Sequence, residues 1–317
     1  MTTVLDNGLA FLFPGQGSQS VGMLKELAAE HPEVQATFAE ASQVLGIDLW
    51  KMTSEGPAEQ LNLTENTQPA MLAAGVAAWR VWRKCSPVLP GWMAGHSLGE
   101  YTALVCAESI EFAAAIGLVR ERARLMQSAV PAGVGAMAAI LGLDDPQVVG
   151  LCSQISSDAE LVAPANFNSP GQIVVAGHAA AVNRLIEAAK EQGAKRAVLL
   201  PVSVPSHCPL MEEASERFRA ALEAVAVETP KIPVVHNVDV VSHAAPEVIR
   251  AVLAKQLCGS VRWSDSVRFM HEQGAHRFVE CGPGKVLMGL GKRIVEGPRF
   301  EALFSPDSLA KSVELVK

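Results

Sequence analysis

The chain has 317 residues, a length that corresponds to about two domains or to one domain with an insertion. Its 26 Lys and Arg residues against 33 Asp and Glu residues give a formal charge of −7. It therefore lacks the basic surplus with which a non-specific nucleic-acid binder neutralises phosphates. With 49% hydrophobic residues, the chain is also too apolar to be disordered. We expect a folded protein with a large core.

No apolar stretch is long enough for a membrane span. The best candidate, Met71 to Trp82, is interrupted by Arg80 and is shorter than the ~18 to 20 residues that a spanning helix needs. The run from Leu9 to Phe13 follows Asp6 and has no cationic segment before it, unlike a signal peptide. The 6 cysteines contain no C-x-x-C pair, which predicts neither a zinc cluster nor a disulfide scaffold. We expect a cytoplasmic protein without a metal site.

The first third of the chain alternates strands and helices. Leu9 to Phe13, ended by Pro14-Gly15, is typical of a buried strand in a parallel sheet. A helix is predicted from Asn66 or Thr67, as its cap, to about Arg83. A short strand from Trp92 to Ala94 follows, and then two helices, Glu100 to Ala107 and about Glu111 to Ala129. This alternation indicates an α/β fold.

The rhythm changes after the breaker Pro131-Ala132-Gly133. The expected order is then strand 136–141, helix 145–156, strand 161–166, strand 172–176, helix 179–192 and strand 196–200. This βαββαβ order is the ferredoxin-like pattern. Beyond it, the alternation resumes with helix 210–225, strand 234–235, helices 246–257 and 263–273, and strand 277–280. We therefore predict a large α/β domain made of residues 1–130 and 203–317, interrupted by a small domain of residues 131–202.

The pentapeptide Gly95-His96-Ser97-Leu98-Gly99 fits the G-x-S-x-G pattern of a nucleophile elbow, a tight strand-to-helix turn that exposes the serine hydroxyl. Glycines are needed there because side chains would collide in the turn. The backbone amide of Leu98, at the start of the following helix, could stabilise an oxyanion. The alternative is an ordinary helix N-terminus capped by Ser97.

A second glycine-rich turn, Pro14-Gly15-Gln16-Gly17-Ser18-Gln19-Ser20, follows the first strand. It nearly matches G-x-G-x-x-G, but Glu40, at the distance where a ribose-binding acid would be expected, lies in a helical stretch. The backbone amides of such a turn could instead complete an oxyanion hole beside Ser97.

Other polar residues cannot be assigned from spacing alone. There are 8 histidines; His207 follows the end of the predicted insertion, which is a plausible place for a loop of a cleft. Arg122 lies on a predicted helix, where most arginines are solvated. The stretch from Asn166 to Gly171 contains turn-forming residues and could be only a turn.

Taken together, several strings in this order resemble the bacterial malonyl-CoA:acyl carrier protein transacylase family, from about Leu9 to about Val295. They are Pro14-Gly15-Gln16-Gly17-Ser18-Gln19, Gly95-His96-Ser97-Leu98-Gly99-Glu100-Tyr101, Arg122 with Met126-Gln127, Asn166-Phe167-Asn168-Ser169-Pro170-Gly171-Gln172, Ser206-His207 and Glu280-Cys281-Gly282-Pro283-Gly284. The resemblance implies an α/β-hydrolase-like large domain with an inserted ferredoxin-like domain, which agrees with the predicted order of elements.

The resemblance also implies roles for individual residues. Ser97 corresponds to the nucleophile that carries the acyl group and His207 to the general base, in a Ser-His dyad held by backbone carbonyls. Arg122 corresponds to the arginine that binds the malonyl carboxylate. The backbone N–H groups of Gln16 and Leu98 correspond to the oxyanion hole. Further positions that line the cavity or support the histidine correspond to Asn166, Asn168 and Gln256.

The implied reaction is ping-pong transfer of malonyl from malonyl-CoA to the phosphopantetheine thiol of acyl carrier protein, through a malonyl-serine ester. It supplies fatty acid elongation and uses no cofactor beyond these two substrates. Three alternatives remain open: a serine esterase or thioesterase, a free-standing acyltransferase of a polyketide pathway, and a non-enzymatic binding module with the same fold.

The implied carrier protein is acidic, and so is this chain, so docking would need a local basic patch. The candidate residues are Arg184, Lys190, Lys195 and Arg196 in the insertion and Lys285, Lys292 and Arg293 near the C-terminal side. We expect a monomer that binds neither nucleic acid nor membrane.

Overall fold

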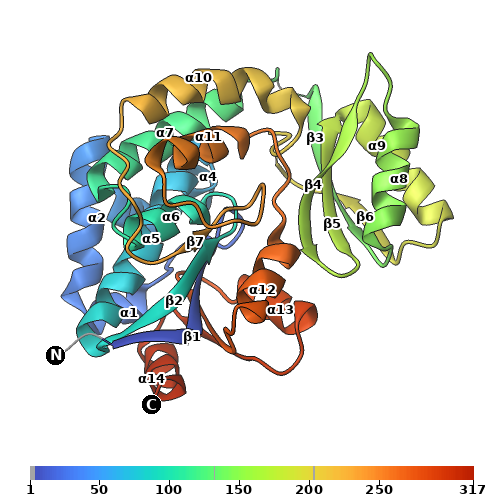
Figure 1. Ribbon diagram of the computed structural model, residues 1–317. Helices are drawn as coiled ribbons and strands as arrows, with labels where there is room; N and C mark the ends of the chain where they lie inside the picture. Colours follow the sequence, from blue (N-terminus) through green and yellow to red (C-terminus); the bar gives the residue numbers. More distant parts are fainter. Residues whose placement is uncertain (1–3, 132, 203) are drawn as a thin grey trace.

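The computed structural model describes residues 4–131, 133–202 and 204–317 (Figure 1). Ala132, in the predicted breaker, and Ser203, at the predicted return to the large domain, lie outside the described residues.

The larger of two sheets has five strands, all parallel, in the order β7-β2-β1-β8-β9. Their bounds are Val234–Val235 (β7), Val88–Gly95 (β2), Val4–Phe13 (β1), Arg277–Cys281 (β8) and Arg299–Leu303 (β9). The predicted strands at 9–13 and 92–94 are thus the buried carboxyl-terminal parts of longer strands. The exposed beginnings, such as Val4 and Leu5, carry no apolar run and were missed for that reason.

Helices cover both faces of this sheet because both faces are apolar. Along β1, Leu9, Phe11 and Phe13 belong to one buried cluster, whereas Ala10 and Leu12 belong to another, as the two-residue period of a strand requires. The first face is covered by α2 (Pro32–Leu45), α5 (Thr64–Cys85), α6 (Gly99–Cys106), α7 (Phe112–Ser128) and α10 (Glu212–Glu223), and the second by α12 (Trp263–Glu272) and α13 (Val286–Ile294). This is the α/β architecture that the alternation of elements predicts.

The remaining helices are short or peripheral: α1 (Lys25–Glu30), α3 (Leu49–Glu55), α4 (Ala58–Leu61), α11 (Pro246–Lys255), α14 (Pro306–Leu315) and a 3-10 turn at Pro209–Met211. The predicted start of α5 is wrong. The helix begins at Thr64, and the Thr67 hydroxyl donates to Leu61 O at 2.6 Å instead of capping the helix. Asn66 likewise donates back to Gln60 O, so both side chains tie α5 to α4.

The second sheet is antiparallel and comes from the predicted insertion. Its strands are β3 (Gly135–Leu141), β4 (Val162–Ser169), β5 (Gln172–His178) and β6 (Arg196–Leu199), in the order β4-β5-β3-β6. With α8 (Asp145–Ile155) and α9 (Ala179–Glu191) they follow the predicted βαββαβ order. Figure 1 shows α8 and α9 on the side of this sheet that faces away from the parallel sheet.

One face of the antiparallel sheet packs against helices, and the other lines a cavity. Ile140, Ile173 and Val175 pack with α8 and α9 in a small core. The opposite face, which includes Met137 and Val174, lines a cavity shared with the large sheet. The arrangement agrees with one α/β part that carries a second, ferredoxin-like part; the residue boundaries 131–202 stay a prediction.

In the described part of the chain, no helix is both long and apolar enough to cross a membrane.

Candidate active site

Ser97 lies where β2 ends and α6 begins, in the turn that the G-x-S-x-G pattern predicts. Its backbone φ is 52°, a left-handed conformation that is uncommon for a residue with a side chain and that is often found at active sites. Glycine is required on both sides. A Cβ on Gly95 would lie 1.8 Å from Gly99 C, and one on Gly99 would lie 2.0 Å from Phe13 O. The turn therefore packs directly against β1.

The glycine-rich turn after β1 lies beside this elbow. A Cβ on Gly15 would come within 2.4 Å of His96 O, so the two turns touch through backbone atoms. Gln16 and Leu98 both line the cavity that contains Ser97. In the described part of the chain their backbone N–H groups have no recorded acceptor, whereas the N–H of Ser97 donates to Asn237 Oδ1 at 2.8 Å. Both amides predicted for the oxyanion hole are thus open to a ligand.

Among the described residues, His207 is the histidine in hydrogen-bond contact with the Ser97 hydroxyl. Its Nε2 lies 2.7 Å from Ser97 Oγ, and its Nδ1 lies 2.7 Å from the carbonyl oxygen of Gln256. A carbonyl only accepts, so Nδ1 carries the proton and Nε2 is free to accept the serine proton. Burial, and next the Arg122 guanidinium, lower the pKa of His207 to about 3. The ring is therefore neutral at neutral pH, as a general base must be.

Arg122, from α7, reaches the same point from inside the molecule and is only 1% exposed. Its Nη2 lies 3.1 Å from Ser97 Oγ and donates to Gln256 Oε1 at 2.9 Å, and its Nη1 donates to Gln68 Oε1 at 2.9 Å. Among the described residues no carboxylate forms an ion pair with it, and its Nε has no partner. The guanidinium also lies over the Tyr101 ring, 5.3 Å from its centroid. A buried guanidinium whose partners are neutral, next to a serine, is suited to bind an incoming carboxylate.

Sequence reasoning missed the residues that hold this cluster from below: Gln68, Glu100, His236 and Asn237. Asn237 accepts from Ser97 N and donates to Gly95 O at 2.8 Å, so its side chain holds the backbone of the turn on both sides of His96. For Glu100, its position directly after the pentapeptide could have indicated a role in the site. For Asn237 and Gln68 the sequence offers no such indication, because their partners Ser97 and Arg122 are 140 and 54 residues away in the chain.

The cavity above Ser97 has a volume of about 620 Å³ and is closed on one side by β4. Asn166 and Asn168 line it as predicted. Asn168 Oδ1 lies 2.8 Å from His96 Nε2, not from His207, and β4 is tied to the large part by Phe167 N donating to Val261 O. Gln256 is fully buried under the site and does not line the cavity; it contacts Arg122 and His207 instead.

The chain is similar to known proteins over most of its length. The acyl transferase domain family matches residues 10–300. The chain belongs to the acyl transferase family.

Relatives of this acyl transferase are similar over nearly their whole length. It is 53% identical over 306 residues to the malonyl CoA-acyl carrier protein transacylase of Escherichia coli strain K12, which covers 96% of this chain and 99% of that protein. The crystal structure of an acyl carrier protein S-malonyltransferase from Vibrio cholerae superposes with a TM-score of 0.94 at 52% identity, over 96% of this chain and 99% of that one. A malonyl transacylase in complex with a type II polyketide acyl carrier protein has a TM-score of 0.95 at 51% identity, over 96% and 99%.

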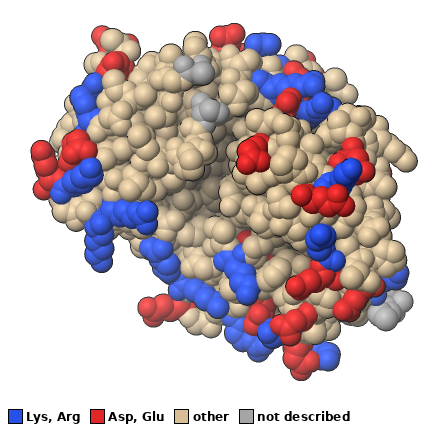
Figure 2. Space-filling view, turned by 180° about the vertical axis from the view of Figure 1, so that it is seen from behind, with Lys and Arg blue, Asp and Glu red and all other residues tan. Residues whose placement is uncertain are grey.

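Exposed basic residues of the acyl transferase border the cavity on one side. Figure 2 shows a hollow with Lys and Arg side chains along its lower border. Arg293 donates to Gln172, a cavity residue, at 2.7 Å, and Gln172 is paired across the sheet with Leu141, which is paired with Arg196. Of the seven predicted docking candidates, Arg184 and Lys190 form ion pairs with Glu160 and Glu187. The five without an acidic partner in the described part of the chain are Lys195, Arg196, Lys285, Lys292 and Arg293, which we call the basic rim.

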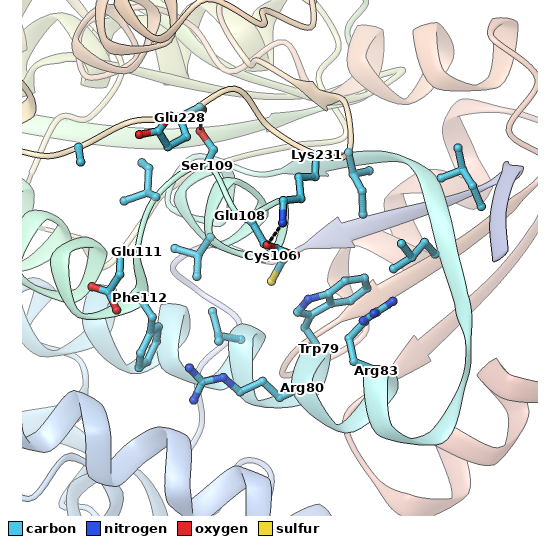
Figure 3. Close-up of a pocket in the computed structure, with 17 residues that line it drawn as sticks. Trp79, Arg80, Arg83, Cys106, Glu108, Ser109, Glu111, Phe112, Glu228 and Lys231 are labelled. Carbon is cyan, nitrogen blue, oxygen red and sulfur yellow. Dashed lines mark hydrogen bonds and ion pairs between the residues drawn. The ribbon is translucent and has the colours of Figure 1, made fainter. Parts of the chain in front are cut away.

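The acyl transferase has a second cavity, of about 550 Å³, at the other end of the parallel sheet (Figure 3). It is lined by residues near the beginnings of β1 and β2, by α5 and by the start of α7, including Trp79 and Phe112. None of the predicted site residues lies there.

Proposed function

We propose that the protein transfers the malonyl group of malonyl-CoA to the phosphopantetheine thiol of acyl carrier protein. The names of the relatives support both substrates. The observation that carries the proposal is the buried Arg122 guanidinium, 3.1 Å from the Ser97 hydroxyl. An esterase acting on uncharged acyl groups would have no use for this cation, whereas a malonyl group presents a carboxylate to it.

In the first half-reaction, Ser97 Oγ attacks the thioester carbonyl while His207 Nε2 takes the hydroxyl proton. The carbonyl oxygen becomes an oxyanion, which the N–H groups of Gln16 and Leu98 stabilise. The intermediate then collapses: the C–S bond breaks, His207 returns the proton to the departing CoA thiolate, and a malonyl-serine ester remains. Arg122 holds the free carboxylate with its planar pair of N–H groups.

In the second half-reaction, the carrier-protein thiol gives its proton to His207 and attacks the ester carbonyl. The bond between the malonyl carbonyl carbon and Ser97 Oγ breaks, and His207 protonates Oγ, so the free enzyme is restored. No cofactor is required besides the two substrates. Asn166 and Asn168 line the wall along which the acyl group enters, and Gln256 orients Arg122 and His207.

The carrier protein, which is expected to be acidic, docks in this proposal on the basic rim. Unpaired cations attract an acidic partner more strongly than cations already neutralised within the protein. The rim also borders the cavity that a phosphopantetheine arm would have to enter.

We assign the malonyl transfer to fatty acid elongation, in the cytoplasm, by a monomeric enzyme. The second candidate is a polyketide pathway, which the similarity to the transacylase bound to a type II polyketide carrier protein favours. Comparing kcat/KM for carrier proteins of the two pathways separates these candidates.

The chemistry is tested by rapid mixing of enzyme, malonyl-CoA and holo carrier protein. Transfer to the carrier thiol should exceed hydrolysis by far; dominant hydrolysis would show a thioesterase. Intact-mass spectra should show a malonyl adduct with malonyl-CoA alone and none in the Ser97→Ala variant. An unchanged adduct in that variant would refute Ser97 as nucleophile, and a protein that forms no adduct would be a binding module.

A further inference from the structure

Glu100 is a fully buried carboxyl group directly below the Ser97 turn, one residue into α6. Its Oε2 accepts from Asn237 N at 3.0 Å and from Gln256 Nε2 at 2.8 Å, and its Oε1 lies 2.8 Å from His236 Nδ1. It does not line the cavity, so it does not touch a substrate. These three contacts satisfy the carboxyl group that burial has removed from water, and they tie it to Asn237, His236 and Gln256.

The contacts of Glu100 fix which way the Gln256 side chain points. An amide has a donor end and an acceptor end that are nearly equal in shape, so only its partners decide its orientation. The donor end of Gln256 faces two atoms that can only accept, Glu100 Oε2 and Ser97 O, at 2.8 and 3.0 Å. The acceptor end must then face Arg122 Nη2, at 2.9 Å.

Glu100 also places a negative charge near the buried Arg122 guanidinium, with the Gln256 side-chain amide between the two groups. A buried cation without a counter-charge is costly, but a carboxylate in direct contact with Arg122 would occupy the N–H groups that the substrate needs. With Gln256 in between, the two charges remain close and the guanidinium is left free of an ion pair in the described part of the chain. In the described part of the chain, Arg122 donates to Gln68, Ser97 and Gln256 and lies over the Tyr101 ring, and none of these contacts is with Asp or Glu.

We propose that Glu100 is the positioning residue of the carboxylate-binding site: it orients Gln256 and supplies the counter-charge that keeps Arg122 ready for an acyl group with a free carboxylate. The proposal rests on the proposed malonyl transfer.

The Glu100→Gln variant separates this role from general support of the fold. Its amide can keep an oxygen toward Gln256 and Asn237 only if its NH₂ faces His236 Nδ1. The proton of His236 must then move to Nε2, which has no partner. The counter-charge is lost in either orientation. We expect acylation of Ser97 by malonyl-CoA to slow by about tenfold or more, the effect of weakening a hydrogen bond to a charged group.

The matched readout is labelling of Ser97 by a fluorophosphonate, which needs the serine, His207 and the oxyanion amides but presents no carboxylate to Arg122. We expect this rate to change by less than about threefold, because Asn237 still holds the turn through Ser97 N and Gly95 O. The matched control is Glu280→Gln, the same substitution at the other carboxyl group among the buried residues of the described chain, and it should change neither rate.

Equal slowing of both reactions in Glu100→Gln would reduce Glu100 to a structural residue and overturn the proposal, as would no slowing of either. A parent enzyme that reacts with the fluorophosphonate but not with malonyl-CoA would overturn the proposed function, and this inference with it. If Glu100→Gln does not fold, Gln256→Glu offers a second test. It brings a carboxylate into contact with Arg122 and should block malonylation by at least about tenfold more than fluorophosphonate labelling.

Discussion

The parallel sheet has a cavity at each end, and the two differ in chemistry far more than in size. Their volumes are about 620 Å³ at the carboxyl ends of β1 and β2 and about 550 Å³ near the amino ends. The first brings Ser97, His207 and Arg122 together. The second is lined mainly by apolar side chains, with charged residues such as Glu108 and Lys231 among them. Volume alone therefore does not mark a functional site; converging polar groups do.

The helices that start at these cavities show why. At the second cavity, the N-cap residue of α7 is Glu111, whose side chain accepts from Ala114 N, so the helix end is capped by its own chain. At the first, the N-cap residue of α6 is Leu98, which provides no side-chain cap. The positive end of that helix and its open N–H group are left for a ligand. Glu108 and Lys231 at the second cavity likewise pair with each other (Figure 3).

The strongest way to break this comparison is His207→Ala. Without the base, the Ser97 hydroxyl keeps its proton and malonyl-serine formation should slow by about 10²- to 10⁴-fold. Stopped-flow acylation by malonyl-CoA measures the effect, with His276→Ala as control, because His276 is exposed and does not line the cavity. A loss below about tenfold would show that another group accepts the proton.

Arg122→Ala should act on one class of substrate. Removal of the guanidinium should lower kcat/KM for malonyl-CoA by about 10²-fold, because the substrate carboxylate is then buried without a partner. Acetyl-CoA, which has no carboxylate, should lose far less. An equal loss with both substrates in an acyl-CoA panel would contradict the carboxylate-binding role.

Phe112→Ala tests whether the second cavity contributes to stability and not to the reaction. Phe112 is 4% exposed and lies under the Arg80 guanidinium, so truncation should lower the free energy of unfolding by about 3 to 5 kcal/mol. Urea unfolding measures this loss. The rate of malonyl transfer per folded molecule should stay within about twofold of the parent rate, because the second cavity contains none of the predicted site residues. A lower rate without a lower stability would give the second cavity a role in the reaction.

The sequence predicts the elbow well because its constraints are local. Gly95, Ser97 and Gly99 lie within five residues, and the strand before them and the helix after them have clear patterns. The βαββαβ order of the insertion was also correct, since each element has its own periodicity. The start of α5 failed because Thr67 caps nothing locally and bonds to α4 instead.

Residue spacing could not predict the side chains that support the site, for the same reason; of these, Gln256 was named only through the resemblance to a family. Asn237 meets Ser97 across 140 positions, and Gln256 meets Arg122 across 134. Spacing in one sequence carries no information on such contacts. The resemblance to a family pointed to Ser97, His207 and Arg122, and the geometry then added Glu100 and Asn237.

A smaller effect is expected from the basic rim. Replacing Lys292 and Arg293 by Glu should raise KM for an acidic carrier protein by about tenfold, with KM for malonyl-CoA nearly unchanged. The matched control is Lys190→Glu, since Lys190 already pairs with Glu187. The difference should shrink with added salt. An equal effect of all three charge reversals would contradict docking on the rim.

The last prediction concerns the stability of the fold and Glu280, whose carboxyl group is buried, does not line the Ser97 cavity and accepts from Met288 N at 2.8 Å. Burial raises the pKa of Glu280 from 4.5 to about 7. Between these values the folded protein keeps a proton that the unfolded chain has released, so this group lowers stability as pH rises from 4.5 to 7.

Glu280→Gln cannot ionise, and its stability relative to the parent should increase by about 1 to 3 kcal/mol between pH 5 and pH 8. Any fixed cost of the new NH₂ group is the same at both pH values and cancels. His207, whose pKa is lowered, destabilises in the opposite direction, toward acid, and is present in both proteins. Urea unfolding of both proteins at the two pH values gives the difference, and a difference that does not change with pH would show that Glu280 stays ionised in the fold.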